Sequence, residues 1–517
     1  MKSRSGLLAV LLIVVFGAPG LTVSALAASR SPATAAAAPK AARSVTEGSV
    51  TVEGNRIDYT ATAGTIILTD RAGKPTGSMF YVAYTKRGMS NESERPVTFF
   101  YNGGPGSSTV WLHMGAYGPQ RIVTADHTHT PAAPYQLVNN EYSLLDVTDE
   151  VFIDAISTGY SRIIRKEGGG VGTRKDFYGV DPDVKAFAQF ITKYLSQNNR
   201  WNSPKYLYGE SYGTLRSEVL ANYLIRRDDM DLNGVVLQSA YMGNSIPFGS
   251  DIQYETILPT MAADAWYHHE LPTQPADLQS FLAQVEQFAM NQYSVALNAG
   301  NTLGQSDFSR IAQKLHDYTG LSVDYLEKAD LRVSPQEFFH ELLNGQDLTL
   351  GRLDGRFTGP TMDPLGETSE YDPQAAAISS AYAAGFNWYA ANVLKYKTDL
   401  YYRPETRVSP WPRADSIPGI RNYGGPPPVN GAIDLAQVMK YDPDLRVQVE
   451  CGYFDFATDY YGMVYSVNHM KIPPDLQSHI QFKYYESGHM IYVHVPDLKK
   501  LHDNVAAFIR GSDNLAG

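Results

Sequence analysis

A serine between two glycines stands where a β-rich run gives way to a helical stretch. Ser211 lies in the sequence Gly-Glu-Ser-Tyr-Gly at 209–213, after the run at 205–210 and before a stretch with helical spacing at 215–227. A tight strand-to-helix turn of this kind lifts a serine hydroxyl above the edge of a sheet. It also directs the N–H groups of the next helix toward a developing negative charge. The pattern predicts a nucleophile, although such a turn can also be purely structural.

Two residues further along the chain could activate this serine. Asp455 follows the run at 446–453, and His489 follows the run at 481–488. In an α/β-hydrolase the nucleophile, the acid and the base occur in this order, each at the end of a strand. His489 would take the proton from Ser211, and Asp455 would hold the imidazole in the required tautomer.

Each of these two assignments has an alternative. Asp455 could cap a following helix, in which case Asp459 would be the competing acid. His489 could be a hydrogen-bonded core histidine. The chain has 12 histidines, and few others follow an apolar strand so directly. Position therefore favours the catalytic interpretation of His489.

A glycine-rich loop follows the strand-like run at 97–102. The sequence Gly-Gly-Pro-Gly at 103–106 has little side-chain bulk, so its backbone N–H groups could approach a reacting carbonyl. A tight turn with no chemical role would have the same sequence. The loop lacks the lysine of a phosphate-binding loop.

These residues require a sheet that collects several strand ends at one edge. Residues 49–86 alternate apolar and polar side chains, which predicts antiparallel strands. Later runs are short, β-rich and apolar, as in strands buried on both faces of a mostly parallel sheet. They lie at 97–102, 150–157, 205–210, 234–240, 446–453 and 481–488, with helical stretches at 183–197, 215–227 and 496–510. The pattern predicts an α/β protein with the α/β-hydrolase fold.

The chain divides into four kinds of segment. Residues 1–27 have the positive start, short apolar run and small-residue end of a signal peptide, with cleavage expected near Ala27 or Ala28. Residues 28–44 predict an Ala- and Pro-rich linker. Strand signals disappear at 247–384, which predicts a helical cap inserted into a catalytic domain formed by 45–246 and 385–517. Residues 401–428 predict irregular structure.

Composition limits the possible partners and location. The net charge of −11 favours neither nucleic acid nor an anionic membrane surface. Cys451 is the only cysteine, so no intramolecular disulfide can form. With the short signal peptide, this predicts an exported bacterial enzyme, periplasmic or secreted, with no membrane association after signal cleavage. The oligomeric state is not predicted.

Four segments together resemble the serine carboxypeptidase family. They are FFYNGGPGSSTVW at 99–111, YGESYG at 208–213, CGYFDFAT at 451–458 and SGHM at 487–490. The resemblance implies removal of one C-terminal residue from a peptide through an acyl-enzyme, with no cofactor. The expected substrates are peptides with a free C-terminus.

The resemblance also implies roles for individual residues. Ser211 would be the nucleophile, His489 the base and Asp455 the acid, with the N–H groups of Gly104 and Tyr212 forming the oxyanion hole. The substrate's terminal carboxylate would bind Asn102, Glu210 and the N–H of Gly103. Met490 is expected to line the leaving-residue pocket.

Glu210 can bind a carboxylate well only as the neutral acid, since two carboxylates repel. We therefore expect better peptidase activity at acidic pH, unless Glu210 instead pairs with an arginine such as Arg216. Many family members have a second Glu where this chain has Ala116, so the strength of the acid preference stays open. The family's Val-Pro after SGHM is replaced by Ile491-Tyr492.

Three other possibilities follow from the sequence. His127, His129, His268 and His269 could bind a metal, but no carboxylate or cysteine supports them at a defined spacing, so solvated loop histidines and no metal are expected. An esterase or acyltransferase could use the same triad without needing Asn102 and Glu210. A non-catalytic binding protein would need a broken triad.

Overall fold

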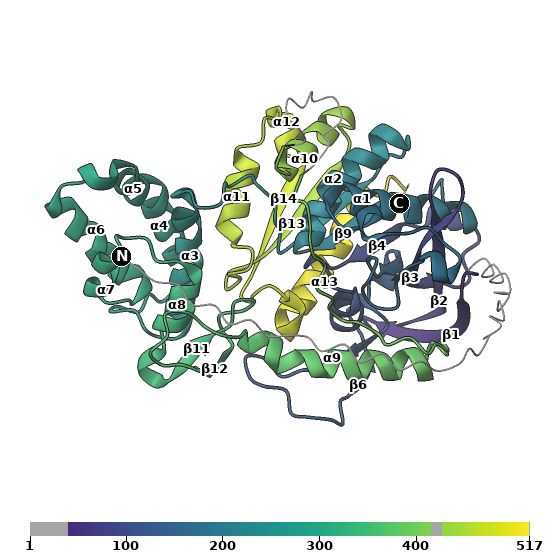
Figure 1. The fold of residues 1–517 in the computed structure, drawn as a ribbon, viewed down its shortest axis with the longest axis horizontal. Coiled ribbons are helices and arrows are strands. Elements are labelled where there is room, and N and C mark those ends of the chain that lie inside the picture. Colours follow the sequence, from purple (N-terminus) through teal and green to yellow (C-terminus); the bar gives the residue numbers. More distant parts are fainter. Residues whose placement is uncertain (1–39, 415–426, 516–517) are drawn as a thin grey trace, which may run out of the picture.

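A ten-stranded mixed sheet forms the centre of the protein (Figure 1). The computed structural model describes residues 40–414 and 427–515. The main path of the sheet has the order β1-β2-β3-β7-β4-β9-β10-β13-β14, and β8 pairs with β3. Strands β1, β2, β3 and β7 pair antiparallel, whereas β7, β4, β9, β10, β13 and β14 run parallel to one another. The carboxyl ends of six strands therefore meet at one edge.

The strands of this sheet have the following bounds: β1 (Arg43–Val52), β2 (Asn55–Thr69), β3 (Pro75–Lys86), β4 (Val97–Tyr101), β7 (Asp149–Ile153), β8 (Arg162–Ile163), β9 (Lys205–Glu210), β10 (Gly234–Gln238), β13 (Arg446–Gly452) and β14 (Ile480–Tyr485). Two short hairpins lie outside it: β5 (Gln120–Ile122) with β6 (Leu137–Asn139), and β11 (Leu348–Leu350) with β12 (Thr358–Pro360).

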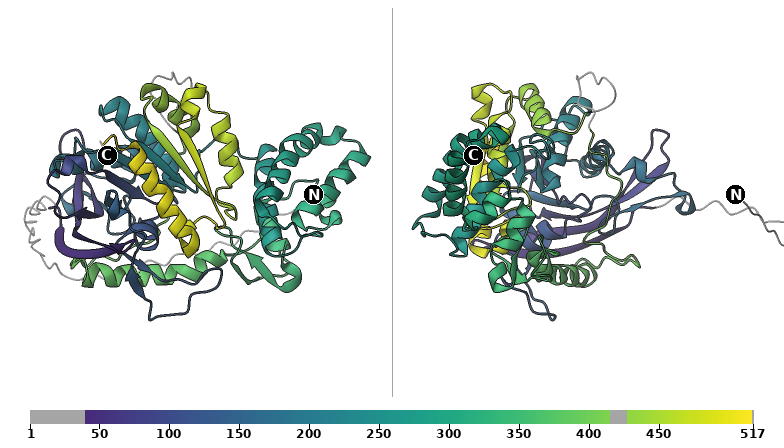
Figure 2. Two further views of the ribbon diagram at one scale, coloured as in Figure 1. Left: turned by 180° about the vertical axis from the view of Figure 1, so that it is seen from behind. Right: turned by 60° about the vertical axis from the view of Figure 1, so that its left-hand side comes forward.

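Helices cover both faces of the sheet (Figures 1 and 2). One face packs against α1 (Val180–Gln197), α2 (Tyr212–Arg227) and α10 (Gly431–Tyr441). The other packs against α9 (Pro373–Asn392) and α13 (Val495–Ser512). Alternate residues of the central strands point to opposite cores, as strand geometry requires: Leu207 lies in the first core and Tyr208 in the second. Burial on both faces explains why these strands are largely apolar.

The predicted cap, residues 247–384, contains most of the remaining helices. They are α3 (Ile252–Tyr267), α4 (Leu278–Phe288), α5 (Ser294–Ala299), α6 (Gln305–Thr319), α7 (Val323–Lys328) and α8 (Pro335–Glu341). These helices extend beyond the end of the sheet (Figure 1), and α3 contacts α11 (Tyr460–Asn468) of the sheet domain. The short helix α12 (Pro474–Gln477) precedes β14.

The predicted fold class is confirmed, with corrections at several boundaries. The first strand, β1, begins at Arg43, inside the predicted linker, because residues 43–52 pair along their whole length with β2. Helix α9 runs unbroken across the predicted cap boundary at 384/385, and the cap contains the hairpin β11–β12, although no strand signal is visible there. The predicted signal peptide, most of the linker and part of 401–428 lie outside the described residues.

Candidate active site

Ser211 occupies the turn between β9 and α2, at the carboxyl edge of the sheet. Its backbone has φ 62° and ψ −132°, a conformation that non-glycine residues seldom adopt. The Ser211 N–H donates to the carbonyl of Gln238, 3.0 Å away at the end of the neighbouring strand β10. A side chain on Gly209 would come within 2.2 Å of the Gly213 carbonyl, so glycine permits the close crossing of strand and helix. The predicted elbow is therefore present.

The side chain of His489 pairs with Asp455. The distance between His489 Nδ1 and Asp455 Oδ2 is 2.8 Å, and both side chains are buried. Asp455 also accepts hydrogen bonds from the backbone N–H groups of Ala457 and Thr458 and from the Thr458 hydroxyl. Asp459, the competing acid, instead caps α11 by accepting from the N–H of Gly462 at 2.8 Å. The geometry therefore separates the two carboxylates by role.

The backbone of His489 is fixed by two other parts of the chain. Its N–H donates to the Leu353 carbonyl in the cap, at 2.6 Å, and its carbonyl accepts from the Ser239 hydroxyl after β10, at 2.7 Å. The preceding N–H, of Gly488, donates to Asp354 at 3.1 Å. A Cβ on Gly488 would lie 2.4 Å from the Asp354 Cβ, so only glycine allows the cap loop to approach this closely.

Two charges control the protonation of His489. Burial, the largest single effect, disfavours the imidazolium, and Arg352 also disfavours it. Asp455 and Glu210 together outweigh these effects and raise the pKa of His489 above its usual value of 6.5. Among the described residues, no hydrogen bond joins the Ser211 hydroxyl to His489. Such contacts often tighten only when substrate binds. The proton transfer between them therefore belongs to the proposed mechanism.

The glycine-rich loop after β4 packs directly against the elbow. A Cβ on Gly103 would lie 2.4 Å from the backbone N of Tyr212, so a larger residue would push the two segments apart. Gly104 has φ 102°, which favours glycine. The loop and the first turn of α2 thus bring the backbone of Gly104 and Tyr212 to the same side of Ser211, where the cavity described below opens.

Glu210 and Asn102 form a buried polar pair beneath the elbow. The Asn102 amide donates to Glu210 Oε1 at 2.7 Å, and Gln238 donates to Oε2 at 3.0 Å. Burial raises the pKa of Glu210 to about 7, although the nearby His489, Tyr492 and Asn102 act to lower it. Glu210 is therefore largely neutral in mildly acidic solution, without a second acid at Ala116.

The alternative partner for Glu210, Arg216, is excluded by its own contacts. Arg216 is fully buried and pairs with Asp183 at 2.7 Å. It also donates to the backbone carbonyl of Asn102 at 2.9 Å. Arg216 thus supports the backbone of the polar pair and does not neutralise its carboxyl group.

Sequence reasoning missed two residues beside Glu210. Gln238 ends β10, and its side-chain oxygen Oε1 accepts a hydrogen bond from the Tyr208 hydroxyl at 2.7 Å. This contact fixes the side-chain amide so that its NH₂ group faces Glu210. The Tyr492 hydroxyl is buried beside Glu210 and Asn102 without a well-directed hydrogen bond to a described residue. Its ring lies against Gly115, next to Ala116. The sequence signal for Gln238 was a polar residue at the end of a predicted strand. The signal for Tyr492 was the departure from the family's Val-Pro after SGHM.

A cavity of about 530 Å³ opens beside Ser211. Gly104 and Tyr212 line it on the elbow side, and Thr458 lines it near the Asp455–His489 pair. The lining residues do not include Met490, which is buried in the core beneath α13, so its expected role in a leaving-residue pocket stays a prediction.

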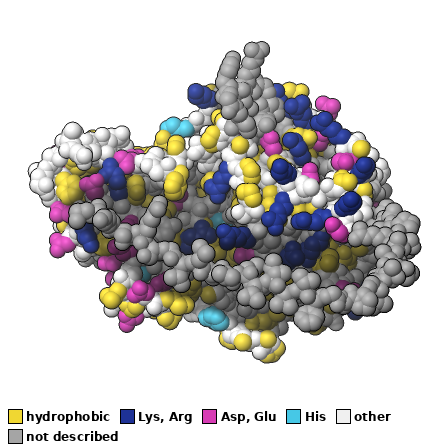
Figure 3. Space-filling view, viewed as in Figure 1, with side chains coloured by type: hydrophobic (Ala, Val, Ile, Leu, Met, Phe, Trp, Pro, Cys, Tyr) yellow, Lys and Arg dark blue, Asp and Glu magenta, His cyan; other side chains and the backbone are white. Residues whose placement is uncertain are grey.

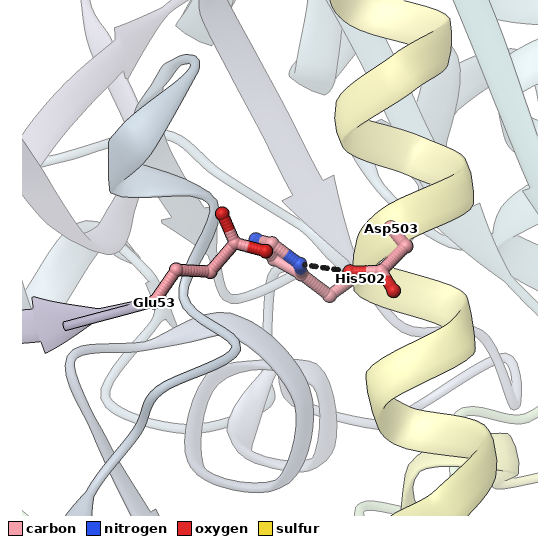
Figure 4. Close-up of side chains that lie close together, drawn as sticks. All are labelled: Glu53, His502 and Asp503. Atoms are coloured by element: carbon pink, nitrogen blue, oxygen red, sulfur yellow. Dashed lines mark hydrogen bonds and ion pairs between the residues drawn. The ribbon is translucent and has the colours of Figure 1, made fainter.

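One His- and acid-containing cluster lies away from this site. Glu53, at the turn between β1 and β2, faces His502 and Asp503 of α13 (Figure 4). The two ring nitrogens of His502 already contact Asp503 (3.1 Å) and Asp146 (3.4 Å), and Lys499 pairs with Asp503. These contacts describe an ion-pair cluster that joins α13 to neighbouring loops. His268, expected to be a solvated loop histidine, is instead half-buried at the end of α3, with Nε2 2.7 Å from the Gly355 carbonyl oxygen.

Comparison with known families agrees with this geometry. The family model for serine carboxypeptidases matches residues 60–344, more than half of the chain. The protein belongs to the serine carboxypeptidase family. The matched region includes the elbow, the glycine-rich loop and most of the cap, and it ends before Asp455 and His489.

One solved structure supports the same fold. The prohormone-processing carboxypeptidase Kex1Δp of Saccharomyces cerevisiae aligns with a TM-score of 0.53 at 15% identity, covering 88% of this chain and 91% of its own. Proline iminopeptidase of Mycobacterium smegmatis aligns at 0.36 and 12% identity (87% and 98% covered), and a carboxyl esterase of Bacillus coagulans at 0.34 and 13% (87% and 98%). The first similarity supports the α/β-hydrolase fold, and no inference is drawn from the other two.

Replacing Asp455 and Asp459 in turn tests the roles assigned to them, Asp455 as the acid of the triad and Asp459 as a helix cap. Asp455→Asn should lower kcat by about 10⁴-fold, because the imidazole loses the carboxylate that orients it. Asp459→Ala should leave kcat within a few-fold but lower the free energy of unfolding by about 1 kcal/mol, since it removes a helix cap. Steady-state kinetics and urea unfolding of both variants provide the comparison. A larger kcat loss in Asp459→Ala would reverse the assignment.

Proposed function

We propose that the protein is an exported carboxypeptidase that releases C-terminal residues from peptides through an acyl-enzyme on Ser211. The observation that carries the proposal is the buried Glu210–Asn102 pair next to the nucleophile. An esterase has no need of a neutral carboxyl group at this point. A peptidase that acts only at a free C-terminus must recognise a carboxylate there.

The triad would act in the order set by its positions. His489 takes the Ser211 proton as the hydroxyl attacks the carbonyl of the last peptide bond, and Asp455, 2.8 Å from Nδ1, stabilises the imidazolium. The N–H groups of Gly104 and Tyr212 receive the oxyanion. His489 then gives its proton to the leaving amino group, and water hydrolyses the resulting ester.

Carboxylate recognition in this scheme depends on one proton. Neutral Glu210 donates a hydrogen bond to the substrate's terminal carboxylate, assisted by Asn102 and the N–H of Gly103. The charge of His489 lowers the pKa of Glu210, and the charge of Glu210 raises the pKa of His489. The two groups therefore titrate as a coupled pair. The productive form has the proton on Glu210 and a neutral His489.

The esterase alternative is tested with three matched substrates: one peptide with a free C-terminus, the same peptide amidated, and a small ester. We expect rapid release of the terminal residue from the free peptide alone. Ser211→Ala should abolish this release, together with labelling by a fluorophosphonate probe. Faster turnover of the ester with no release from the peptide would support an esterase or acyltransferase instead.

The role of Glu210 predicts a pH dependence. Peptide kcat/KM should fall about tenfold per pH unit above pH 7, where Glu210, with a pKa of about 7, loses its proton. In Glu210→Gln this alkaline fall should disappear, because the amide donates a hydrogen bond at every pH. An ester without a carboxylate serves as the control and should show no such fall. A wild-type peptide profile that is flat or rising from pH 5 to 8 would remove Glu210 from this role.

Export is proposed from the N-terminal sequence. Residues 1–27 have the features of a signal peptide, so the mature protein should begin near Ala28 or Ser29 and be periplasmic or secreted. In the described part of the chain, no helix is both long and apolar enough to cross a membrane. N-terminal sequencing of the protein from a bacterial periplasm or culture medium checks the cleavage. An intact Met1 start would contradict it.

A further inference from the structure

Among the described residues, two arginines are the only charged ones that line the cavity beside Ser211. Arg352 comes from the cap and Arg413 from the segment before α10, and no described Asp or Glu is among the lining residues. Both arginines are exposed. The chain as a whole carries a net charge of −11, so a cavity whose only charges are positive differs from the rest of the protein.

Arg352 belongs to an acidic cap and, like Lys328, forms no ion pair with a described residue. Residues 247–384 contain 19 Asp and Glu but only six Lys and Arg, and in Figure 3 mainly acidic side chains appear on this helical part, whereas Lys and Arg gather over the sheet domain. Four of the six basic residues form ion pairs with a carboxylate: Arg310, Lys314, Arg332 and Arg356. Arg352 forms none with any described residue, despite the surplus of acids around it.

The charge of Arg352 acts on two acids, Asp372 and Glu405, but forms an ion pair with neither. Asp372 caps α9 and accepts from the N–H of Leu353, while Glu405 responds to the Arg352 charge without forming an ion pair. Arg413 donates only to the Tyr241 hydroxyl, at 3.4 Å, among described partners. Toward the described residues, most of the five donors of each guanidinium group are thus without a partner.

The position of the cavity indicates which part of a substrate would meet these arginines. Ser211, Gly104 and Tyr212 line it, whereas Asn102 and Glu210 do not. A peptide with its terminal carboxylate at Glu210 and its last peptide bond at Ser211 would therefore place the acyl part of the chain, N-terminal to that bond, in the cavity.

We infer that Arg352 and Arg413 bind a carboxylate on the acyl part of the substrate, so that the enzyme prefers peptides with Asp or Glu in the penultimate position. The inference rests on the proposed carboxypeptidase function and specifies its substrate class. Guanidinium groups suit carboxylates because their planar donors match both oxygens. Each exposed pair contributes modestly, and the interaction weakens as salt screens it.

The test uses peptides that differ only in the penultimate residue, which is Glu, Gln or Lys, with the terminal residue held constant. At a pH below 7 and low salt, kcat/KM for Glu should exceed that for Gln by about five- to tenfold, and Lys should be poorest. The Glu/Gln ratio should approach one in Arg352→Gln/Arg413→Gln and fall partly in each single variant. Raising the salt to 1 M should also reduce it in the wild-type enzyme.

Arg407→Gln is the matched control, because Arg407 is an exposed arginine six residues before Arg413 that does not line the cavity. Its Glu/Gln ratio should equal the wild-type value. Fluorophosphonate labelling of Ser211 confirms that each variant is folded. Equal cleavage of all three peptides, or an unchanged Glu/Gln ratio in the double variant, would overturn the inference about Arg352 and Arg413 and leave the proposed carboxypeptidase function in place. Labelling without cleavage of any peptide would overturn the proposed function, and the inference with it.

Discussion

The position of one imidazole depends on three separate parts of the fold. His489 is held by Asp455 after β13, by Ser239 after β10 and by Leu353 of the cap. None of these groups is close to His489 in sequence. Their convergence requires parallel strands in register, a tight turn at Gly488 and a cap loop that reaches the sheet edge. The core packing on both faces of the sheet provides that registration, since it fixes where each strand ends.

Burial supplies part of the proposed chemistry at this edge. Glu210 is surrounded by amide donors and tyrosine side chains, and burial is the main cause that raises its pKa to about 7. A second carboxyl group is therefore unnecessary, and the missing side chain of Gly115 leaves room for the ring of Tyr492. The same desolvation strengthens the interaction between Glu210 and His489, so the binding group and the base are electrostatically linked.

Much of this arrangement follows from the sequence because it depends on local patterns. Apolar runs predict the strands, and the residues after them, Ser211, Asp455 and His489, are then brought to one edge by topology. The roles of Asp455 and Asp459 could not be separated, since both precede helical sequence and either could cap it. The roles of Gln238, Tyr492 and Leu353 were not predicted, because each depends on a contact with a residue more than 25 positions away in the chain. The predicted cap boundary at 384/385 falls inside α9 for a related reason. The buried side of this helix packs against the sheet domain, which is also a contact between distant parts of the chain.

The hydrogen bond from His489 to Leu353 limits how far the cap can be altered. Caps on hydrolase folds are often regarded as exchangeable modules that adapt a fixed catalytic core to new substrates. Here the insertion supplies the acceptor for a buried N–H of the catalytic base, and leaving such a group unpaired costs about 1–3 kcal/mol. A chimera that replaced the whole insertion would inherit a loosened histidine, whereas one that retained the loop from Leu353 to Arg356 could vary the surrounding helices.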